Sequence, residues 1–187
     1  MPLRVSALSI PDVLRLEPQR FDDSRGYFVE TYSKRTFDLP VDVFVQDNEA
    51  LSTQRGTLRG LHFQLAPSPQ AKLVRVIKGS VFDVAVDLRE GSATYGRWCG
   101  ATLTAAEGTQ LFIPRGFAHA HCTLEPDTLF AYKVDGYYDK AAESGIRFDD
   151  PDIGIEWPIS HAEIKVSEKD VALPYLRDAA TPFRFGS

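Results

Sequence analysis

Residues 56–65 read Gly-Thr-Leu-Arg-Gly-Leu-His-Phe-Gln-Leu, and this stretch decides the fold that the chain is expected to adopt. Apolar side chains alternate along it with small or polar ones: Leu61, Phe63 and Leu65 against Gly60, His62 and Gln64. Successive side chains of a strand point to opposite faces of the sheet. The alternation therefore predicts a strand whose apolar face packs on a core and whose polar face, with His62, lines a pocket.

A wider spacing surrounds this strand, made of two sets of residues: Gly56, His62, Gln64, Lys72 and Gly79, then Gly108, Pro114, Gly116 and His119. It resembles the two motifs of the cupins, which are small double-sheet β-barrels. In metal-binding cupins these motifs supply three histidines and a glutamate. Here Gln64 stands at the second histidine position, and Lys72 stands at the glutamate position. Divalent metals need deprotonated ligands, so the resemblance predicts a cupin without a metal or other cofactor. A metal-dependent cupin stays open, because His119 and His121 form a His-x-His pair.

Length and composition suit one domain over residues 1–187, with a core at about 14–174 and a loose tail at about 179–187. The hydrophobic fraction of 43% is enough for a core. The net charge of −5 argues against nucleic acid or an anionic membrane as a partner. Two cysteines without paired spacing and an N-terminus without a long apolar run predict a cytoplasmic protein.

Short runs rich in Val, Phe, Tyr and Thr recur between turn signals, as strands do. Those expected as strands are Tyr27–Tyr32, Leu73–Ile77, Val81–Leu88, Thr109–Ile113 and Thr128–Val134. A short helix is expected at 34–37. A longer one is expected within 160–172, where Ser167 and Asp170 have the spacing of a capping box. The pattern predicts a mainly β sandwich or barrel with a few short helices.

Asp83 is an unusual residue in the apolar run 81–88. It shares a strand face with Val81, Ala85 and Asp87. A buried carboxylate needs a partner. We expect a histidine or a lysine to face Asp83 across the barrel.

Several further segments, in this order, resemble one family over about residues 14–174: Arg25–Glu30, Val45–Asn48, Leu58–Gln64, Lys72–Val76, Val81–Asp87, Ile113–His119, Tyr132-Lys133 and Tyr137-Tyr138. The family is the dTDP-4-dehydrorhamnose 3,5-epimerases, which are cupin jelly-roll barrels. Its substrate is dTDP-4-keto-6-deoxy-glucose, in which carbons 3 and 5 flank a ketone. The resemblance implies an isomerase that needs a base, an acid on the opposite face of the sugar, and a donor to the enolate oxygen.

The resemblance assigns the catalytic roles to four residues. His62 would be the base, and Asp170 would pair with its other ring nitrogen. Tyr132 would be the acid on the opposite face. Lys72 would stabilise the enolate and contact the substrate, which would explain a cation at a metal-ligand position. Asp170 also has a second reading, as a helix cap.

Other residues would bind the substrate. His119, oriented by Asp83, would face the sugar, and Arg25 and Arg59 would contact the diphosphate, with a further contribution from Lys169.

The nucleoside has its own set of contacts in this resemblance. Glu30, Gln46 and Asn48 would read the thymidine, and Tyr138 would stack on its base. Glu143 matches a further position that contacts the ligand. His121 and His161 are expected to be structural or solvated.

In this family the N-terminal strands cross to a partner subunit. The resemblance therefore implies a homodimer in which Arg25 and Glu30 serve the neighbour's site.

Some positions depart from the family pattern, namely Glu49-Ala50, Ala120-His121 and Gly136. They keep open a single-site epimerase that acts at C3 or C5 alone. A second alternative is a cupin that binds a nucleotide sugar without catalysis.

Overall fold

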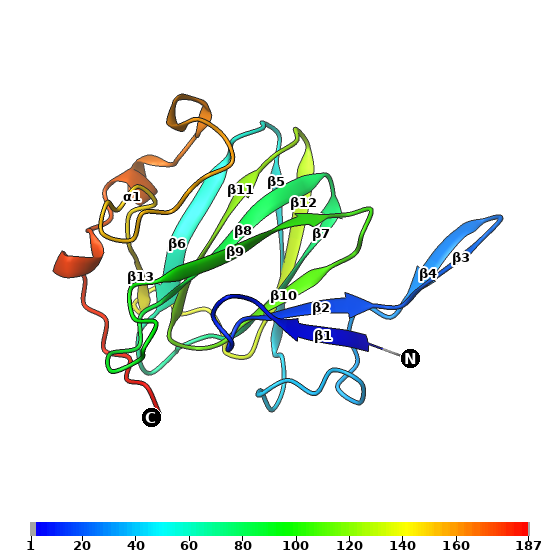
Figure 1. Ribbon diagram of the computed structural model, residues 1–187, viewed down its shortest axis with the longest axis horizontal. Coiled ribbons are helices and arrows are strands. Elements are labelled where there is room, and N and C mark those ends of the chain that lie inside the picture. Colours follow the sequence, from blue (N-terminus) through cyan, green and yellow to red (C-terminus); the bar gives the residue numbers. More distant parts are fainter. Residues whose placement is uncertain (1–2, 187) are drawn as a thin grey trace.

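Antiparallel strands form two facing sheets in the computed structural model, which describes residues 3–186 (Figure 1). The six-stranded sheet runs in the order β1 (Leu3–Ala7), β2 (Leu14–Pro18), β10 (Gln110–Ile113), β7 (Lys72–Lys78), β12 (Thr128–Val134) and β5 (Gln46–Ser52). The five-stranded sheet runs β13 (Glu143–Gly145), β6 (Leu58–Gln64), β11 (Phe117–Thr123), β8 (Ser80–Asp87) and β9 (Trp98–Thr104). A separate hairpin, β3 (Arg20–Asp23) and β4 (Gly26–Val29), projects from the body.

The five strands expected from sequence are all present, and the mainly β, cupin-type architecture is confirmed. Residues 128–134 form a strand with the predicted bounds, and the others differ at their ends. The largest difference is in the segment 27–32, where β4 already ends at Val29. Tyr32 instead packs edge-on against Phe37 and Phe44, so it belongs to the cover of the six-stranded sheet.

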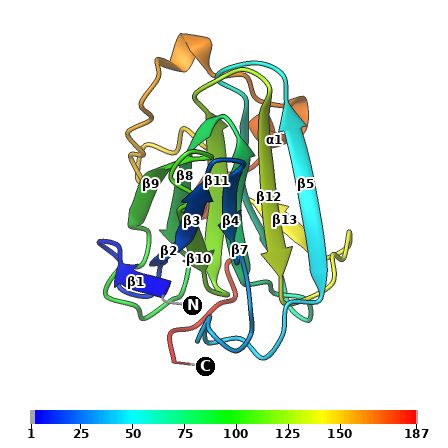
Figure 2. The ribbon, with the colours of Figure 1, turned by 90° about the vertical axis from the view of Figure 1, so that its right-hand side faces the viewer.

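Apolar side chains form three layers, one between the sheets and one outside each sheet. Val74, Leu111 and Phe130 are part of the layer between the sheets. Leu61 and Phe63 lie in the layer outside the five-stranded sheet, so the predicted apolar face of β6 is confirmed. The C-terminal third of the chain covers this layer; it lies at the left of Figure 1 and therefore toward the back of Figure 2.

The two helix predictions are wrong, the first in kind and the second in extent. Residues 34–36 form a turn. The segment 160–172 splits into a 3-10 helix, η1 (His161–Glu163), and one α-helical turn, α1 (Glu168–Val171). The two are separated because Lys165 bonds to the end of β6 through its backbone: its N–H donates to Gly56 and its carbonyl accepts from Leu58. A last 3-10 helix, η2, spans Leu176–Asp178.

The C-terminal segment lies against the barrel, which differs from the loose tail that was expected. Glu90 exchanges backbone hydrogen bonds with Phe183 and Phe185, at 2.9 and 3.0 Å. The Phe183 ring packs edge-on against Phe63. These contacts tie the tail to the outer layer. The predicted domain also includes Met1, Pro2 and Ser187, which lie outside the described residues. No helix in residues 3–186 has the length and hydropathy of a membrane span.

Candidate active site

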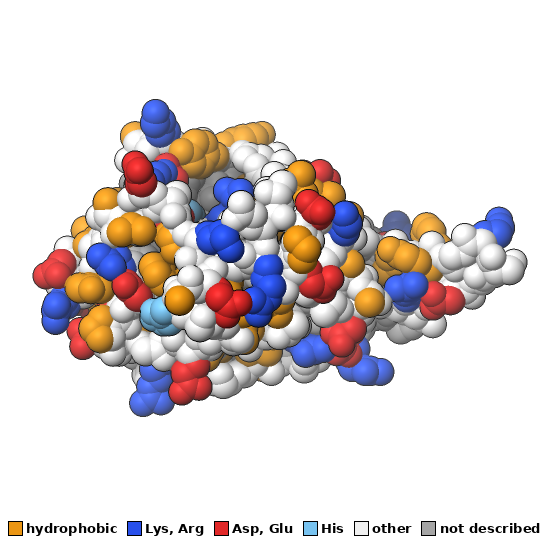
Figure 3. Space-filling model, turned by 90° about the horizontal axis from the view of Figure 1, so that it is seen from above, with side chains coloured by type: hydrophobic (Ala, Val, Ile, Leu, Met, Phe, Trp, Pro, Cys, Tyr) orange, Lys and Arg blue, Asp and Glu red, His pale blue; other side chains and the backbone are white. Residues whose placement is uncertain are grey.

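A cavity of about 680 Å³ opens between the two sheets. From above, the surface is hollowed at one place, with a histidine inside and Lys or Arg side chains beside it (Figure 3). Seven of the residues predicted for the site line this cavity: Arg59, His62, Lys72, His119, Tyr132, Lys169 and Asp170. Most of these groups are cationic or can become so. Basic side chains are therefore concentrated in this cavity on a chain of negative net charge.

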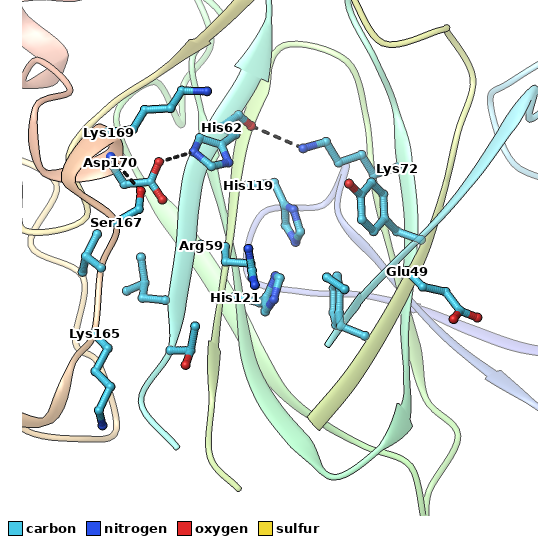
Figure 4. Close-up of a pocket in the computed structure, with 16 residues that line it drawn as sticks. Glu49, Arg59, His62, Lys72, His119, His121, Lys165, Ser167, Lys169 and Asp170 are labelled. Atoms are coloured by element: carbon cyan, nitrogen blue, oxygen red, sulfur yellow. Dashed lines mark hydrogen bonds and ion pairs between the residues drawn. The ribbon is translucent and has the colours of Figure 1, made fainter. Parts of the chain in front are cut away.

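The expected pair of His62 and Asp170 is present (Figure 4). His62 Nε2 lies 2.7 Å from Asp170 Oδ1. Burial by itself would raise the pKa of Asp170, but the hydrogen bond and the charge of His62 outweigh it and hold this pKa below its usual value. An ionised carboxylate at Nε2 favours the tautomer with the proton on Nε2, which leaves the Nδ1 lone pair free to accept a proton.

Asp170 is held in place by α1. Its backbone N–H donates to the side chain of Ser167, at 3.1 Å, so the predicted cap is confirmed on one side. The carboxylate of Asp170 points to β6, where it accepts from His62 and, at 3.5 Å, from the N–H of Gly60. Asp170 therefore both pairs with His62 and takes part in the cap of α1, the two roles that the sequence left open.

Tyr132 and Lys72 lie on the opposite wall, in the six-stranded sheet. Tyr132 pairs with Val74 of β7, and Lys72 pairs with Val134 of β12. They are therefore diagonal neighbours on one inner face. Burial raises the pKa of Tyr132, against a smaller opposing effect of Arg59, so its hydroxyl keeps a proton to donate. Burial lowers the pKa of Lys72 to about 8, although Asp83 opposes this.

Asp83 has a histidine partner, as expected, but this partner is His119 on the neighbouring strand β11 and not a residue across the barrel. His119 Nε2 lies 2.9 Å from Asp83 Oδ2, and both side chains are buried. Burial raises the pKa of Asp83 well above its usual value, against the opposing charge of Lys72. Burial, Lys72 and His62 lower the pKa of His119. Burial therefore disfavours the charged form of both members of the pair.

A register shift between β6 and β11 brings Arg59 into the cavity with His62. His119 pairs with His62, but His121 pairs with Arg59, so one strand carries an extra residue between the two pairs. Strict alternation would place Arg59 on the apolar face with Leu61. The extra residue is Gly60, with φ of +123°. A Cβ there would lie 2.5 Å from the carbonyl oxygen of His119, so no larger residue fits without a shift of the backbone.

Of the residues expected near the nucleoside, all but Glu30 form one continuous chain at the rim. The amide of Gln46 donates to Asn48 at 2.8 Å and accepts from the backbone of Tyr138 at 3.1 Å. The hydroxyl of Tyr138 donates to Glu143 at 2.9 Å, and Glu143 pairs with Lys169 at 2.6 Å. Lys169 lines the cavity, so the rim and the cavity are connected.

Arg25 and Glu30 are not part of this chain's cavity. Arg25 lies in the turn of the projecting hairpin, where it is 88% exposed and pairs with Asp23. Glu30 follows β4 and accepts from the hydroxyl of Thr36 at 2.9 Å. Neither residue meets the other predicted site residues within one chain.

Several lining residues were not expected: Glu49, Ala50, His121, Phe130, Lys165 and Ser167. The spacing of two between His119 and His121 is a signal that could have indicated one of them. Lys165 and Ser167 line the cavity because the backbone of Lys165 is bonded to β6. Over residues 3–186, no three His, Cys, Asp or Glu side chains converge as a metal site requires.

Comparisons with known proteins agree with this geometry. A family model described as dTDP-4-dehydrorhamnose 3,5-epimerase matches residues 7–178. The dTDP-4-dehydrorhamnose 3,5-epimerase of Sinorhizobium fredii is 48% identical over 181 residues, which cover 96% of this chain and 92% of that one. A dTDP-4-dehydrorhamnose 3-epimerase of Streptomyces niveus is 34% identical over 174 residues, covering 91% and 84%.

The solved structures include a relative with a bound sugar nucleotide. It is the dTDP-6-deoxy-D-glucose-3,5-epimerase of Legionella pneumophila in complex with dTDP-4-keto-L-rhamnose. Its TM-score is 0.92, its identity is 37%, and 100% of both chains is covered. On the match of the family model and of these relatives, the chain belongs to the dTDP-4-dehydrorhamnose 3,5-epimerase family.

Proposed function

We propose that this protein converts dTDP-4-dehydro-6-deoxy-D-glucose into dTDP-4-dehydro-L-rhamnose by inverting C3 and C5, as a step of deoxysugar synthesis. One observation carries the proposal. A histidine held by a carboxylate lies on one wall of the cavity, and a tyrosine and a lysine lie on the other. Inversion next to a ketone needs groups on both faces of the sugar ring.

Each inversion then balances as two proton transfers. His62 Nδ1 takes the proton from the carbon, and the electron pair of the C–H bond moves into the ring, which leaves an enolate at the C4 oxygen. The ammonium of Lys72 stabilises the negative oxygen. Tyr132 gives its hydroxyl proton to the same carbon from the opposite face. His62 then releases its proton to solvent, and the tyrosinate takes one up.

The cations near the mouth suit the diphosphate of the substrate. Arg59 and Lys169 line the cavity and would pair with the phosphate oxygens, for which a guanidinium fork is well shaped. The rim chain of Gln46, Asn48, Tyr138 and Glu143 would contact the nucleoside. We propose that His119, held by Asp83, contacts the sugar.

A homodimer is part of the proposal. The projecting hairpin exposes Phe28 and Tyr27, at 61% and 56%, which is costly for a monomer in water. In a dimer the partner subunit would cover these rings, and the hairpin would bring Arg25 and Glu30 to the partner's cavity. Sedimentation equilibrium of the purified protein tests this, since a monomer at micromolar concentration would contradict it.

The chemistry is tested by proton NMR of the substrate with the enzyme in D2O and EDTA. Deuterium at both C3 and C5 is expected. Deuterium at one carbon would instead support a single-site epimerase, the class of the Streptomyces niveus relative. Binding without exchange would support a cupin that only binds. Loss of exchange in EDTA, restored by a divalent metal, would overturn a reaction without a metal.

The location in the cell is also proposed. Cys99 and Cys122 are both free and buried, as thiols of a reducing compartment commonly are. We place the protein in the cytoplasm on this ground, and fractionation of cells that express it is the test.

A further inference from the structure

His121 has no role in the reaction proposed above, although it faces the same cavity. It lies beside Arg59 and His119 in the close-up (Figure 4). The residue is only 5% exposed, and its Nε2 atom is buried without a hydrogen-bond partner among the described residues. Nε2 exposes almost no surface, so a ligand in the cavity would meet the ring at Nδ1, which is not among the buried atoms without a partner.

A second buried atom without a partner belongs to the residue directly opposite. Asp83 Oδ1 and His121 Nε2 are the two such side-chain atoms in residues 3–186. Asp83 and His121 are paired in the register of β8 and β11, on the inner face. Unmet hydrogen-bonding capacity is therefore concentrated at one place directly behind the cavity wall.

The ring of His121 is fixed in orientation and neutral. It stacks on Phe130 with a centroid distance of 4.0 Å and an interplanar angle of 19°. Burial lowers the pKa of His121 well below its usual value, and repulsion from Arg59 and from the protonated form of His119 adds to this. A neutral imidazole offers one N–H and one lone pair. A hydroxyl, which both donates and accepts, matches this better than a phosphate.

The position of Arg59 indicates which hydroxyl this is. His121 is paired with Arg59 across the shifted register of β11 and β6. In the proposed function, on which this step rests, Arg59 holds the diphosphate, and the diphosphate is attached to C1 of the hexose. The hydroxyl nearest to C1 is that of C2. We propose that His121 is a specificity-determining residue that hydrogen-bonds the C2 hydroxyl of the sugar.

The test compares the natural substrate with its 2-deoxy analogue, by kcat/KM of deuterium exchange at C3 and C5. Wild type should favour the natural substrate by about tenfold or more, as a site built for a hydroxyl does. His121→Phe should lose about tenfold on the natural substrate and almost nothing on the analogue. His121→Asn, which keeps a donor and an acceptor, should restore part of the preference. The matched control is His161→Phe, since His161 is exposed and lies outside the cavity.

Folding of the variants is checked by thermal unfolding without ligand. His121→Phe should unfold at the same temperature or a few degrees higher, because it removes a buried atom without a partner. Should this variant not fold, His121→Leu takes its place. The wild-type enzyme alone also tests the proposal, because equal kcat/KM on both substrates would exclude a hydrogen bond from His121 to the C2 hydroxyl.

Two other results would overturn the proposal. An equal loss on both substrates would mean that His121 acts through Asp83 and His119 and not on the hydroxyl. An unchanged preference in His121→Phe would mean that another group reads C2. Either result leaves the proposed function intact, because the enzyme still exchanges both carbons. If wild type binds dTDP but exchanges neither substrate, the proposed function fails and this inference fails with it.

Discussion

The His62–Asp170 pair and the His119–Asp83 pair face the same cavity, with similar N–O distances of 2.7 and 2.9 Å. Their surroundings differ. His62 keeps 32% of its side chain exposed, and its partner's carboxyl has a lowered pKa. His119 and Asp83 are almost fully buried, and the pKa of that carboxyl is raised. The same two residue types therefore give a carboxyl whose ionised form is favoured at the mouth and a carboxyl whose protonated form is favoured at the base.

The largest effect should come from His62→Ala, which removes the base of the first pair. Activity should fall about a thousandfold, as expected for the loss of a general base. Binding of dTDP should stay within about threefold, because the rim and the cations are untouched. Stopped-flow deuterium exchange measures the activity, and calorimetry with dTDP measures the binding. Turnover close to wild type would exclude His62 as the base.

The two carboxylates should respond differently to the same change. Asp170→Asn should lower kcat roughly 100-fold, because an amide cannot hold His62 in the tautomer that accepts a proton. Asp83→Asn should stay within about fivefold of wild type, because an amide resembles a protonated carboxyl in its hydrogen bonding. The comparison of kcat for the two variants is the measurement. Equal losses would contradict the difference in charge between the pairs.

Lys72 lies near the buried Asp83–His119 pair, and its titration should set an upper pH limit on activity. Its pKa of about 8 means that it loses its charge as the pH rises through this value. The protonated form stabilises the enolate, so kcat should fall about tenfold per pH unit well above pH 8. Lys72→Arg should remove this fall, because a guanidinium stays charged. A fall with the same midpoint in Lys72→Arg would assign the titration to another group.

The smallest effect is on stability, and it compares Asp83 with Asp87 on the same strand. Burial by itself would raise the pKa of Asp87, but hydrogen bonds from Arg89, Ser92 and Thr94 hold it at about 2. Ionised Asp87 therefore stabilises the fold above its unfolded pKa of 3.8, and this contribution is lost as the pH falls toward 2. It amounts to about 2 kcal/mol.

The contribution of Asp83 to stability changes with pH in the opposite direction. Its raised pKa means that its contribution to stability is present below the unfolded pKa and is lost as the pH rises through the folded one. At pH 7, Asp87→Asn should lower the free energy of unfolding, and Asp83→Asn should raise it. Urea unfolding of both variants at pH 3 and pH 7 measures this. Changes of the same sign at pH 7 would contradict the assignment.

The sequence predicted what depends on local alternation and on motifs. The apolar face of Leu61 and Phe63 followed from period two, and the partner of Asp83 followed from the cost of a buried carboxylate. Contacts between distant backbones could not be predicted. Lys165 divides the expected helix because its backbone bonds to Gly56, which is 109 positions earlier. Arg59 enters the cavity only through the register of β6 on β11, which the local pattern does not contain.

The absence of a side chain at Gly60 has a consequence for redesign of this scaffold. Since the backbone of His119 lies where a Cβ would be, the strand that carries His62 and the strand that carries His119 are fitted to each other and cannot be adjusted separately. A laboratory that wishes to fit a larger sugar should leave this junction alone. Room has to be made in the opposite sheet or at the rim, where a library of variants would keep the proton-accepting side in place.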